Sequence, residues 1–338
     1  MDRCVAVYGA GGHTGRFVVS ELLRRGIRPI AIGRDQARLA AAGFLNRGVE
    51  LRLASIEDAR SLDRAFAGAA VVINCAGPFL DTADAVAAAA MRSGMHYLDV
   101  TAEQASAKAT LERFDEPARR AGVLVIPAMG FYGGLSDLLV TAAMGEWTAA
   151  DEINLGLALD SWHPTSGTRL TGARNTVPRL VVLNGKLAPL PQPPLSRIWQ
   201  FPAPFGPQEV AETPFSETVL IAHHLRTSEL RTFLTATALR DIRDPATPPP
   251  RPVDAYGRSA QRFLVEAVIR SGGRERRALA SGRDIYAISA PLVCEAAKHL
   301  LDGSATGAGA RAPGAAFHAM PFLKALAPEP LSIEIAGM

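Results

Sequence analysis

A glycine-rich turn near the N-terminus constrains the fold of this chain more than any other feature. Residues 9–15 read Gly-Ala-Gly-Gly-His-Thr-Gly; they follow the apolar run 4–8 and precede the amphipathic stretch 16–23. A strand, a glycine turn and a helix start in this order are typical of a dinucleotide-binding βα unit, because glycine lets backbone N–H groups approach a pyrophosphate at the helix N-terminus. The predicted cofactor-binding residues of this turn are Gly9, Gly11, Gly12, His13, Thr14 and Gly15.

The first 127 residues alternate regularly between strand and helix patterns. Strands are predicted at 4–8, 29–32, 49–54, 70–75, 96–100 and 123–127, and helices near 14–25, 35–42, 57–67, 82–93 and 103–121. The run 71–73 is continuously apolar, as a central parallel strand is. We therefore predict that residues 1–127 form an α/β Rossmann domain with a doubly wound parallel sheet. If its strand order is 3-2-1-4-5-6, ligands bind where the order reverses, beside the first and fourth strands.

After Pro127 the pattern changes. Segments 152–160, 177–184, 216–224, 229–237, 261–270 and 276–282 read as strands without regular crossover helices. They predict a second α+β domain at 128–338, built on a mixed or antiparallel sheet, which we expect to bind substrate and to support a homodimer. The proline-rich stretches 188–207 and 245–252 are predicted to be loops. A helical segment at about 285–327 is predicted to pack back on the Rossmann domain.

The end of the second strand bears on the choice between NADP and NAD. An NAD site places an acid there for the ribose 2′-hydroxyl, whereas an NADP site places a cation for the 2′-phosphate. Arg34 stands at this position and Arg38 follows one helical turn later, which favours NADP (NADPH). If the strand ends one residue later, Asp35 could bind the ribose hydroxyls and the site would take NAD. The other alternative is that Arg34 is a solvated surface side chain without a role in cofactor binding.

Two further strand exits carry polar residues near the expected ligand site. After the fourth strand, the turn Ala76-Gly77-Pro78 is predicted to approach the nicotinamide ribose. On the fifth strand, period two places Tyr97 and Asp99 on one face. Asp99 is a predicted catalytic residue that meets a substrate cation or orients a water, and Tyr97 is predicted to contact substrate. His96 lies at the far end of this strand and is expected to be structural.

The sixth strand leaves through a glycine-flanked aromatic pair, Phe131-Tyr132. Tyr132 is predicted to donate a proton to a developing amine or alkoxide. Packing against the nicotinamide or the domain interface is an equally open role for it. Phe131 is predicted to contact substrate.

In the second domain, Arg169 or Arg174 could hold a carboxylate in a bidentate pair, and Arg174 is predicted to contact substrate.

Composition and charge exclude several classes of function. The chain has 338 residues and a net charge of +3, spread without the basic patch of a nucleic-acid-binding protein. No apolar run is long enough to span a bilayer. The three cysteines and the adjacent pair His223-His224 lack metal-ligand spacing, so no metal is expected. Because the glycine turn begins nine residues from the N-terminus, we expect no signal peptide and a cytoplasmic location.

At these positions the chain resembles the saccharopine dehydrogenase-like oxidoreductase superfamily, including its trans-acting enoyl reductase branch. The matching segments are Gly9–Gly15, Gly33-Arg34, Asn74–Phe79, His96–Asp99, Thr101–Glu103, Gly130-Phe131, Ser136-Asp137, 284–301 and 309–313. The resemblance implies an NADP-binding Rossmann domain and a second domain whose sheet often supports dimers. Ala102 stands where the family commonly has glycine, and Tyr132 stands where it often has aspartate. Both departures fall where substrate is expected, so the resemblance does not identify the substrate.

The combined prediction is an NADPH-dependent oxidoreductase that delivers hydride to a C=N, C=O or activated C=C bond of a small metabolite. Tyr132 and Asp99 are the leading catalytic candidates. The alternative is a non-catalytic NADP-binding sensor or assembly subunit, because the sequence contains no convincing acid–base pair.

Overall fold

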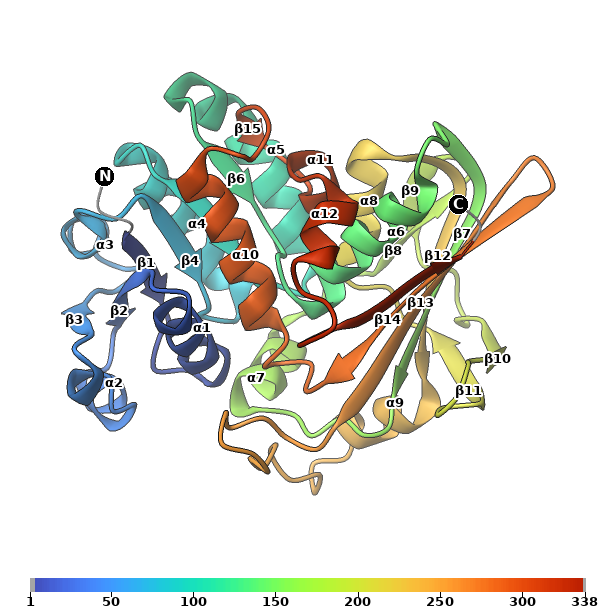
Figure 1. The fold of residues 1–338 in the computed structure, drawn as a ribbon, viewed down its shortest axis with the longest axis horizontal. Helices are drawn as coiled ribbons and strands as arrows, with labels where there is room; N and C mark the ends of the chain where they lie inside the picture. Colours follow the sequence, from blue (N-terminus) through green and yellow to red (C-terminus); the bar gives the residue numbers. More distant parts are fainter. Residues whose placement is uncertain (1–3, 337–338) are drawn as a thin grey trace.

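Residues 4–336, which the computed structural model describes, contain a parallel sheet and a mixed sheet (Figure 1). The strands of the parallel sheet are β1 (Cys4–Tyr8), β2 (Arg28–Gly33), β3 (Glu50–Leu53), β4 (Val71–Asn74), β5 (His96–Asp99), β6 (Leu124–Ile126) and β15 (Gly309–Ala310). Their order is β15-β6-β5-β4-β1-β2-β3, and every pair is parallel. The predicted doubly wound parallel sheet is confirmed; its first six strands have the order 3-2-1-4-5-6, on which the expected ligand position depends, and β15 is an added edge strand.

Helices join these strands and cover the parallel sheet. They are α1 (His13–Arg24), α2 (Gln36–Ala41), α3 (Ala59–Phe66), α4 (Phe79–Arg92) and α5 (Gln104–Ala121), with a short 3₁₀ turn at Leu45–Arg47. Val18, Val19 and Leu22 recur at helical spacing and bury one face of α1. The carboxylates of Asp35 and Asp58 accept backbone N–H groups at the starts of α2 and α3, as N-cap residues do.

The mixed sheet confirms the predicted second α+β fold. Its strands are β7 (Ala149–Leu159), β8 (Leu180–Leu183), β9 (Lys186–Pro189), β10 (Ser196–Gln200), β11 (Pro207–Glu212), β12 (Arg226–Thr235), β13 (Arg262–Ser271), β14 (Arg274–Arg283) and β16 (Ser332–Ala336). The main order is β10-β11-β12-β7-β13-β14-β16, and β8 joins β12 to β9. Only the β12–β7 pair is parallel among these described strands, so the sheet is largely antiparallel.

Two predicted elements of the second half are wrong. Segment 216–224, predicted as a strand, is the helix α8 (Ser216–His224), which packs against α5. Its apolar run Val219-Leu220-Ile221 is buried, and periodicity cannot tell a short buried helix from a buried strand. The predicted loop 188–207 contains the edge strand β10, whose five residues include no proline, so the prolines on either side of it do not interrupt its pairing with β11.

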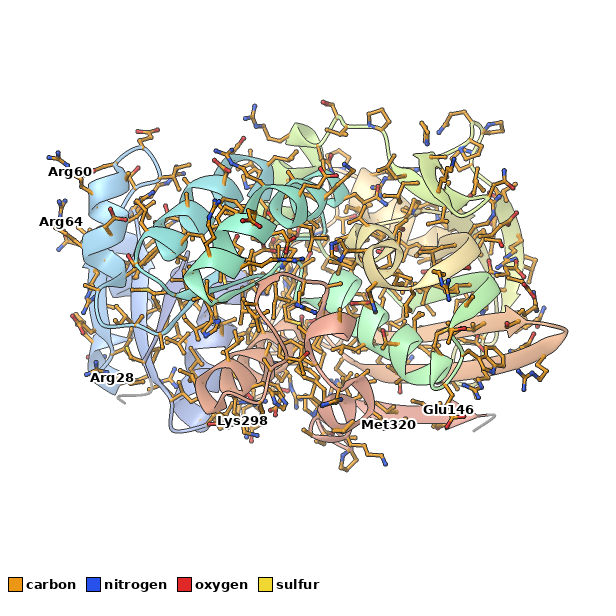
Figure 2. All side chains as sticks on the ribbon, turned by 90° about the horizontal axis from the view of Figure 1, so that it is seen from above. Arg28, Arg60, Arg64, Glu146, Lys298 and Met320 are labelled. Atoms are coloured by element: carbon orange, nitrogen blue, oxygen red, sulfur yellow. The ribbon has the colours of Figure 1, made fainter. Side chains whose placement is uncertain are left out.

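The C-terminal quarter returns to the parallel sheet. After α6 (Ser136–Met144), α7 (Ser166–Arg174) and α9 (Ala236–Arg243), the chain forms α10 (Ser289–Asp302), α11 (Pro313–Ala316) and α12 (Ala319–Lys324). Helix α10 packs on α1, and Arg25 pairs with Glu295 across that contact. Figure 2 shows Lys298 of α10 and Met320 of α12 along the same edge of the molecule. None of the helices in residues 4–336 is long and apolar enough to cross a membrane.

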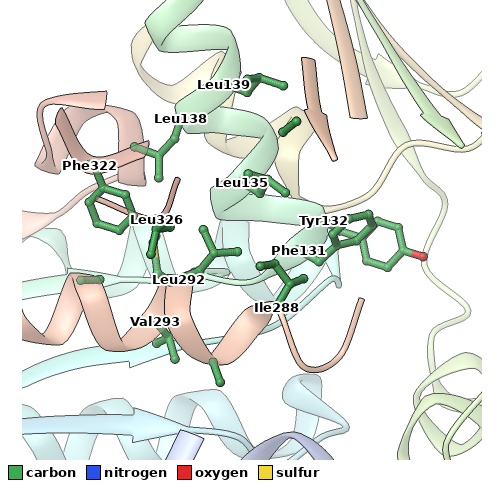
Figure 3. Close-up of a cluster of buried hydrophobic side chains, with 14 of the residues drawn as sticks. Phe131, Tyr132, Leu135, Leu138, Leu139, Ile288, Leu292, Val293, Phe322 and Leu326 are labelled. Carbon is green, nitrogen blue, oxygen red and sulfur yellow. The ribbon is translucent and has the colours of Figure 1, made fainter. Parts of the chain in front are cut away.

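A shared hydrophobic core fixes the position of the sixth strand exit. Leu135, Leu138 and Leu139 pack with Leu292 of α10 and Phe322 of α12 (Figure 3). Immediately before α6, the segment Phe131–Leu135 forms a single π-helical turn. The core therefore holds the base of the aromatic pair Phe131-Tyr132, and Figure 3 shows the Tyr132 ring directed away from this cluster.

Candidate active site

A cavity of about 1060 Å³ lies between the elements of the two sheets. The parallel sheet contributes the loops that follow β1, β2, β4 and β5, together with the π-helical turn after β6. The second half contributes α7 and the segment 213–215 before α8. The cavity therefore sits at the carboxyl ends of β1 and β4, where the strand order reverses and where ligands of doubly wound sheets bind.

The glycine turn forms a backbone cradle at one end of this cavity. Gly9 has φ +80°, and a Cβ atom on it would lie 2.8 Å from the Ala76 backbone nitrogen. Gly15 is buried beneath the turn, where a Cβ atom would collide with the Gly9 carbonyl oxygen. The residues of the turn that line the cavity are Gly9, Gly11, Gly12, His13 and Thr14. Side chains are excluded where a pyrophosphate would approach the N-terminus of α1, so this cradle fits a dinucleotide.

Two arginines face the cavity at the end of β2. Arg34 and Arg38 both line it, and both are exposed. Among the described residues, no carboxylate forms an ion pair with either guanidinium. Asp35 also lines the cavity, but its carboxylate accepts the Arg38 backbone N–H at 3.1 Å and caps α2. Free cations beside an engaged carboxylate suit a 2′-phosphate better than a bare ribose hydroxyl.

The turn Ala76–Pro78 also lines the cavity, and buried polar side chains hold its shape. The Ala76 N–H donates to Asn74 Oδ1 at 3.0 Å, and the Thr82 hydroxyl donates to the Ala76 carbonyl oxygen at 2.5 Å. Across the cavity, a Cβ atom on Gly77 would lie 3.1 Å from the Thr171 hydroxyl of α7. A side chain at position 77 would therefore require the Thr171 hydroxyl to shift slightly, and the turn and α7 approach each other closely here.

The structure corrects the roles predicted for Tyr97 and Asp99. Both are fully buried, and neither lines the cavity. One Asp99 oxygen accepts the Thr101 and Ala128 backbone N–H groups at 3.0 and 2.8 Å, and the other accepts the Tyr97 hydroxyl at 2.9 Å. Burial raises the pKa of Asp99 to about 6, although these hydrogen bonds act in the opposite direction and lower it. Asp99 therefore organises the two loops that follow β5 and β6, and its carboxylate is engaged by these hydrogen bonds outside the cavity lining.

Glu103 has a similar supporting role that the sequence did not reveal. Its carboxylate accepts the backbone N–H groups of Phe79 at 2.7 Å and Leu80 at 3.2 Å, at the start of α4. Its own N–H donates to the Thr101 hydroxyl at 3.0 Å. Burial raises the pKa of Glu103. The segment 101–103 thus ties the loop after β5 to the turn after β4, and both line the cavity.

Tyr132 lines the cavity, and its buried hydroxyl lacks a hydrogen-bond partner among the described residues. Its ring stacks on Phe215 with centroids 4.0 Å apart and lies 5.5 Å from Trp162. The hydroxyl is buried and forms no hydrogen bond with any described residue, and burial raises the pKa of Tyr132 well above its ordinary value. A buried unsatisfied hydroxyl costs about 1–3 kcal/mol, which a bound ligand could offset. Phe131 lines the cavity beside it.

The predicted substrate role of Arg174 is also corrected. Arg174 is exposed, pairs with Asp81 at 2.7 Å and does not line the cavity. Arg169 donates to the carbonyl oxygens of Asp244 and Thr247. Besides Arg34 and Arg38, the arginine of the described chain that lines the cavity is Arg179, and nothing in its local sequence distinguishes it from the other arginines.

Tyr286 is another cavity residue without a role predicted from the sequence. Its hydroxyl accepts the Trp162 indole N–H at 3.0 Å and lies 2.9 Å from the Thr168 hydroxyl of α7. Its ring meets the His13 ring edge to face at 5.3 Å. Tyr286 therefore connects α7 to the glycine turn. Among residues 4–336, no three or more His, Cys, Asp or Glu side chains gather as a possible metal site.

Comparison with known proteins agrees with this geometry. Residues 5–126 match the family model of the saccharopine dehydrogenase NADP binding domain. A lipid droplet localized protein of Caenorhabditis elegans is 30% identical over 146 residues, which cover 40% of this chain and 34% of that protein. A saccharopine dehydrogenase-like oxidoreductase of Bos taurus is 29% identical over 152 residues, covering 40% and 35%. The chain thus spans about a third of the length of these curated relatives.

The whole fold also has a solved counterpart. The apo saccharopine dehydrogenase (L-Glu forming) of Saccharomyces cerevisiae superposes with a TM-score of 0.69 at 15% identity, covering 99% of this chain and 100% of that chain. This similarity concerns the fold, whereas the family match concerns the segment that builds the glycine cradle and the Arg34 position. Residues 5–126 are therefore similar to the saccharopine dehydrogenase NADP binding domain, and this similarity supports NADP as the cofactor.

Proposed function

We propose that the chain is an NADPH-dependent reductase acting on a C=N, C=O or activated C=C bond of a small molecule bound between its two halves. The observation that carries this proposal is the position of the Tyr132 hydroxyl. It lacks a partner among the described residues, and Tyr132 lines the same cavity as the glycine cradle and the Ala76–Pro78 turn.

Different residues along the cavity would bind different parts of NADPH. The glycine cradle would hold the pyrophosphate, Arg34 the 2′-phosphate, and the turn at 76–78 the nicotinamide ribose. NADPH, when bound, supplies the hydride. The aromatic wall of Tyr132, Phe215 and Trp162 would exclude water from the reacting bond. Tyr132, whose pKa burial raises, is protonated at neutral pH, and its Oη would donate a hydrogen bond or a proton to the atom that gains charge.

A substrate screen tests the proposal. NADPH oxidation would be followed with cyclic imines, ketones and enoyl compounds, using the wild-type chain and the Tyr132→Phe variant. We expect turnover with one of the three classes and a large loss of kcat in the variant. Tight NADPH binding without oxidation of any class would contradict the proposal.

One observation favours a second candidate, a non-catalytic NADP sensor. Asp99 is withdrawn from the cavity, so Tyr132 is the remaining member of the predicted catalytic pair. In addition, the Arg174–Asp81 ion pair links α7 to α4, so bound cofactor could bias the contact between the two halves. A change in oligomeric state on adding NADPH, without its oxidation, would support this role. The predicted homodimer and cytoplasmic location stay predictions.

A further inference from the structure

We infer that the substrate carries a phosphate group, and that this group binds in a second, arginine-lined chamber beside the main cavity. The inference rests on the proposed function for the reacting bond. It adds a separate binding site for another part of the substrate.

The second chamber has a volume of about 560 Å³. Thr168, Arg179 and Leu239 line both this chamber and the main cavity, so the two spaces adjoin. Helix α7 lies between them, with Thr171 lining the main cavity and Arg169 lining the chamber. A substrate could therefore place its reacting bond at Tyr132 and extend past α7 into the chamber.

The lining of the chamber is strongly positive. Its charged residues within the described chain are Arg169, Arg179, Arg243 and Glu212. Glu212 is already compensated, because it pairs with Arg231 at 2.9 Å and accepts the Leu195 N–H at 3.4 Å. Three arginines thus line the chamber, and the one carboxylate among its described residues is already paired.

Two of these arginines are fixed in place without losing their charge. Arg169 Nη2 donates to the carbonyl oxygens of Asp244 and Thr247 at 3.1 and 2.7 Å. Arg179 Nη1 donates to the Pro214 carbonyl oxygen at 2.5 Å. A guanidinium has five N–H donors, so each keeps donors for a ligand. Neither these two nor Arg243 forms an ion pair with a carboxylate in the described part of the chain.

Arg179 links the chamber to the reacting end of the cavity. Its guanidinium lies 4.9 Å from the centroid of the Phe215 ring, which also stacks on Tyr132. Burial lowers the pKa of Arg179, Glu217 opposes this shift, and the like charge of Arg243 adds to it. Glu217 is itself buried and accepts the Thr232 hydroxyl at 2.6 Å. Glu217 and Tyr132 outweigh the repulsion from Arg243 but not the desolvation, so an anion in the chamber would further stabilise the charged form of Arg179.

The number of arginines favours phosphate over carboxylate. One guanidinium satisfies a carboxylate through two parallel hydrogen bonds, whereas a phosphate monoester presents three oxygens and a charge of about −1.5 to −2. Arginine recognises phosphate through the same fork, and several arginines can share one group. Three arginines around one chamber therefore match the oxygens and charge of a phosphate group, and they are more than a carboxylate needs.

Calorimetric titration of the full chain with inorganic phosphate tests the inference. The protein is first saturated with NADP⁺, so that the phosphate sites of the cofactor are filled. We expect the wild type to bind phosphate, and Arg179→Gln and Arg243→Gln each to raise the Kd by about 10-fold or more. The matched control is Arg240→Gln, which removes the same charge from an exposed position of α9 outside the chamber. Its Kd should equal that of the wild type.

Arg243→Gln keeps the test decisive if Arg179→Gln fails to fold, since the Arg243 side chain forms no hydrogen bond with described residues. No phosphate binding by the wild type, or equal affinity in Arg243→Gln and Arg240→Gln, overturns the inference. Tighter binding of glutarate than of phosphate through the same arginines overturns it as well. Because this experiment measures binding, a lack of phosphate binding contradicts the inference and leaves the proposed hydride transfer untouched. A protein that binds phosphate but oxidises no NADPH contradicts only the proposed function.

Discussion

Tyr132 stacks on Phe215 with ring centroids 4.0 Å apart and planes inclined by 25°. Tyr132 belongs to the π-helical turn after β6, and Phe215 immediately precedes α8 in the second half of the chain. The pair therefore joins the two halves at the cavity wall. It holds the Tyr132 ring while leaving its hydroxyl without a partner among residues 4–336. A π-helical turn is rare and often marks a functional site, which agrees with this placement.

The Tyr132→Phe variant separates a chemical role from a packing role. If Oη donates a proton, kcat should fall by about 10²-fold or more with little change in KM. The stacking on Phe215 is retained, and a buried unsatisfied hydroxyl is removed, so Tm should stay equal or rise slightly. Steady-state kinetics and thermal unfolding measure both quantities. An unchanged kcat would show that Tyr132 acts only as part of the wall.

Arg34→Asp should change the preference between cofactors. We expect the Kd for NADPH to rise by about 10- to 100-fold, because a charge-assisted contact to the 2′-phosphate is lost, while the Kd for NADH changes far less. Fluorescence titration with each cofactor measures this ratio. Arg60→Asp, the same charge change on the exposed start of α3 (Figure 2), is the matched control. Equal weakening of both cofactors by Arg34→Asp would refute the 2′-phosphate contact.

Asp99→Asn should preserve kcat, because Asp99 does not line the cavity and an amide oxygen can keep both backbone hydrogen bonds. Asp99→Ala should lower the free energy of unfolding by roughly 2–4 kcal/mol, since it leaves buried N–H groups unpaired. Kinetics combined with urea unfolding distinguishes the two variants. Loss of kcat in a well-folded Asp99→Asn protein would restore Asp99 as a catalytic candidate.

Asp99 should also make stability depend on pH. Its pKa is raised by burial to about 6 in the folded chain, above the value of an unfolded aspartate. The contribution of Asp99 to the free energy of unfolding is therefore fully present below the pKa of an unfolded aspartate. It is lost as the pH rises through about 6, the pKa in the folded chain. The free energy of unfolding of the wild type, relative to Asp99→Asn, should fall by an amount on the order of 2 kcal/mol between pH 4 and about pH 7. A parallel pH profile in the two proteins would contradict this.

His224 should produce a second pH effect at higher pH. Burial lowers its pKa, but Asp137, 2.7 Å from its Nε2 atom, outweighs burial and raises the pKa overall. The folded pKa lies above the unfolded value, so this stabilisation is present at low pH and is lost as pH rises through the folded pKa. Urea unfolding of the wild type and His224→Gln should show a difference that shrinks from pH 6 to pH 9. A difference that grows with pH would contradict the sign.

The sequence predicted the parallel sheet and the glycine turn at its ligand-binding end. Both depend on local patterns: the alternation of apolar strands with helices, and glycines where side chains would block the backbone. Gly9 illustrates this, because its left-handed φ and its contact with Ala76 follow from the turn itself. Arg34 follows equally from its place at the end of β2.

The substrate end was decided by tertiary structure. Period two placed Asp99 on a strand face, but only the packing of the loops after β5 and β6 shows that its oxygens are consumed by backbone N–H groups. Segment 216–224 became a helix because its apolar run is buried against α5, which no local period reveals.

Arginine is abundant in this sequence, and its neighbours along the chain do not distinguish Arg174 from Arg179. The fold pairs Arg174 with Asp81 at the surface and brings Arg179 to the cavity beside Phe215. The sequence by itself therefore determined where the glycine cradle forms, because glycine geometry and strand order are local and periodic. Tertiary structure alone decided which side chains of the second half line the cavity, because burial and charge pairing depend on residues far apart in the chain.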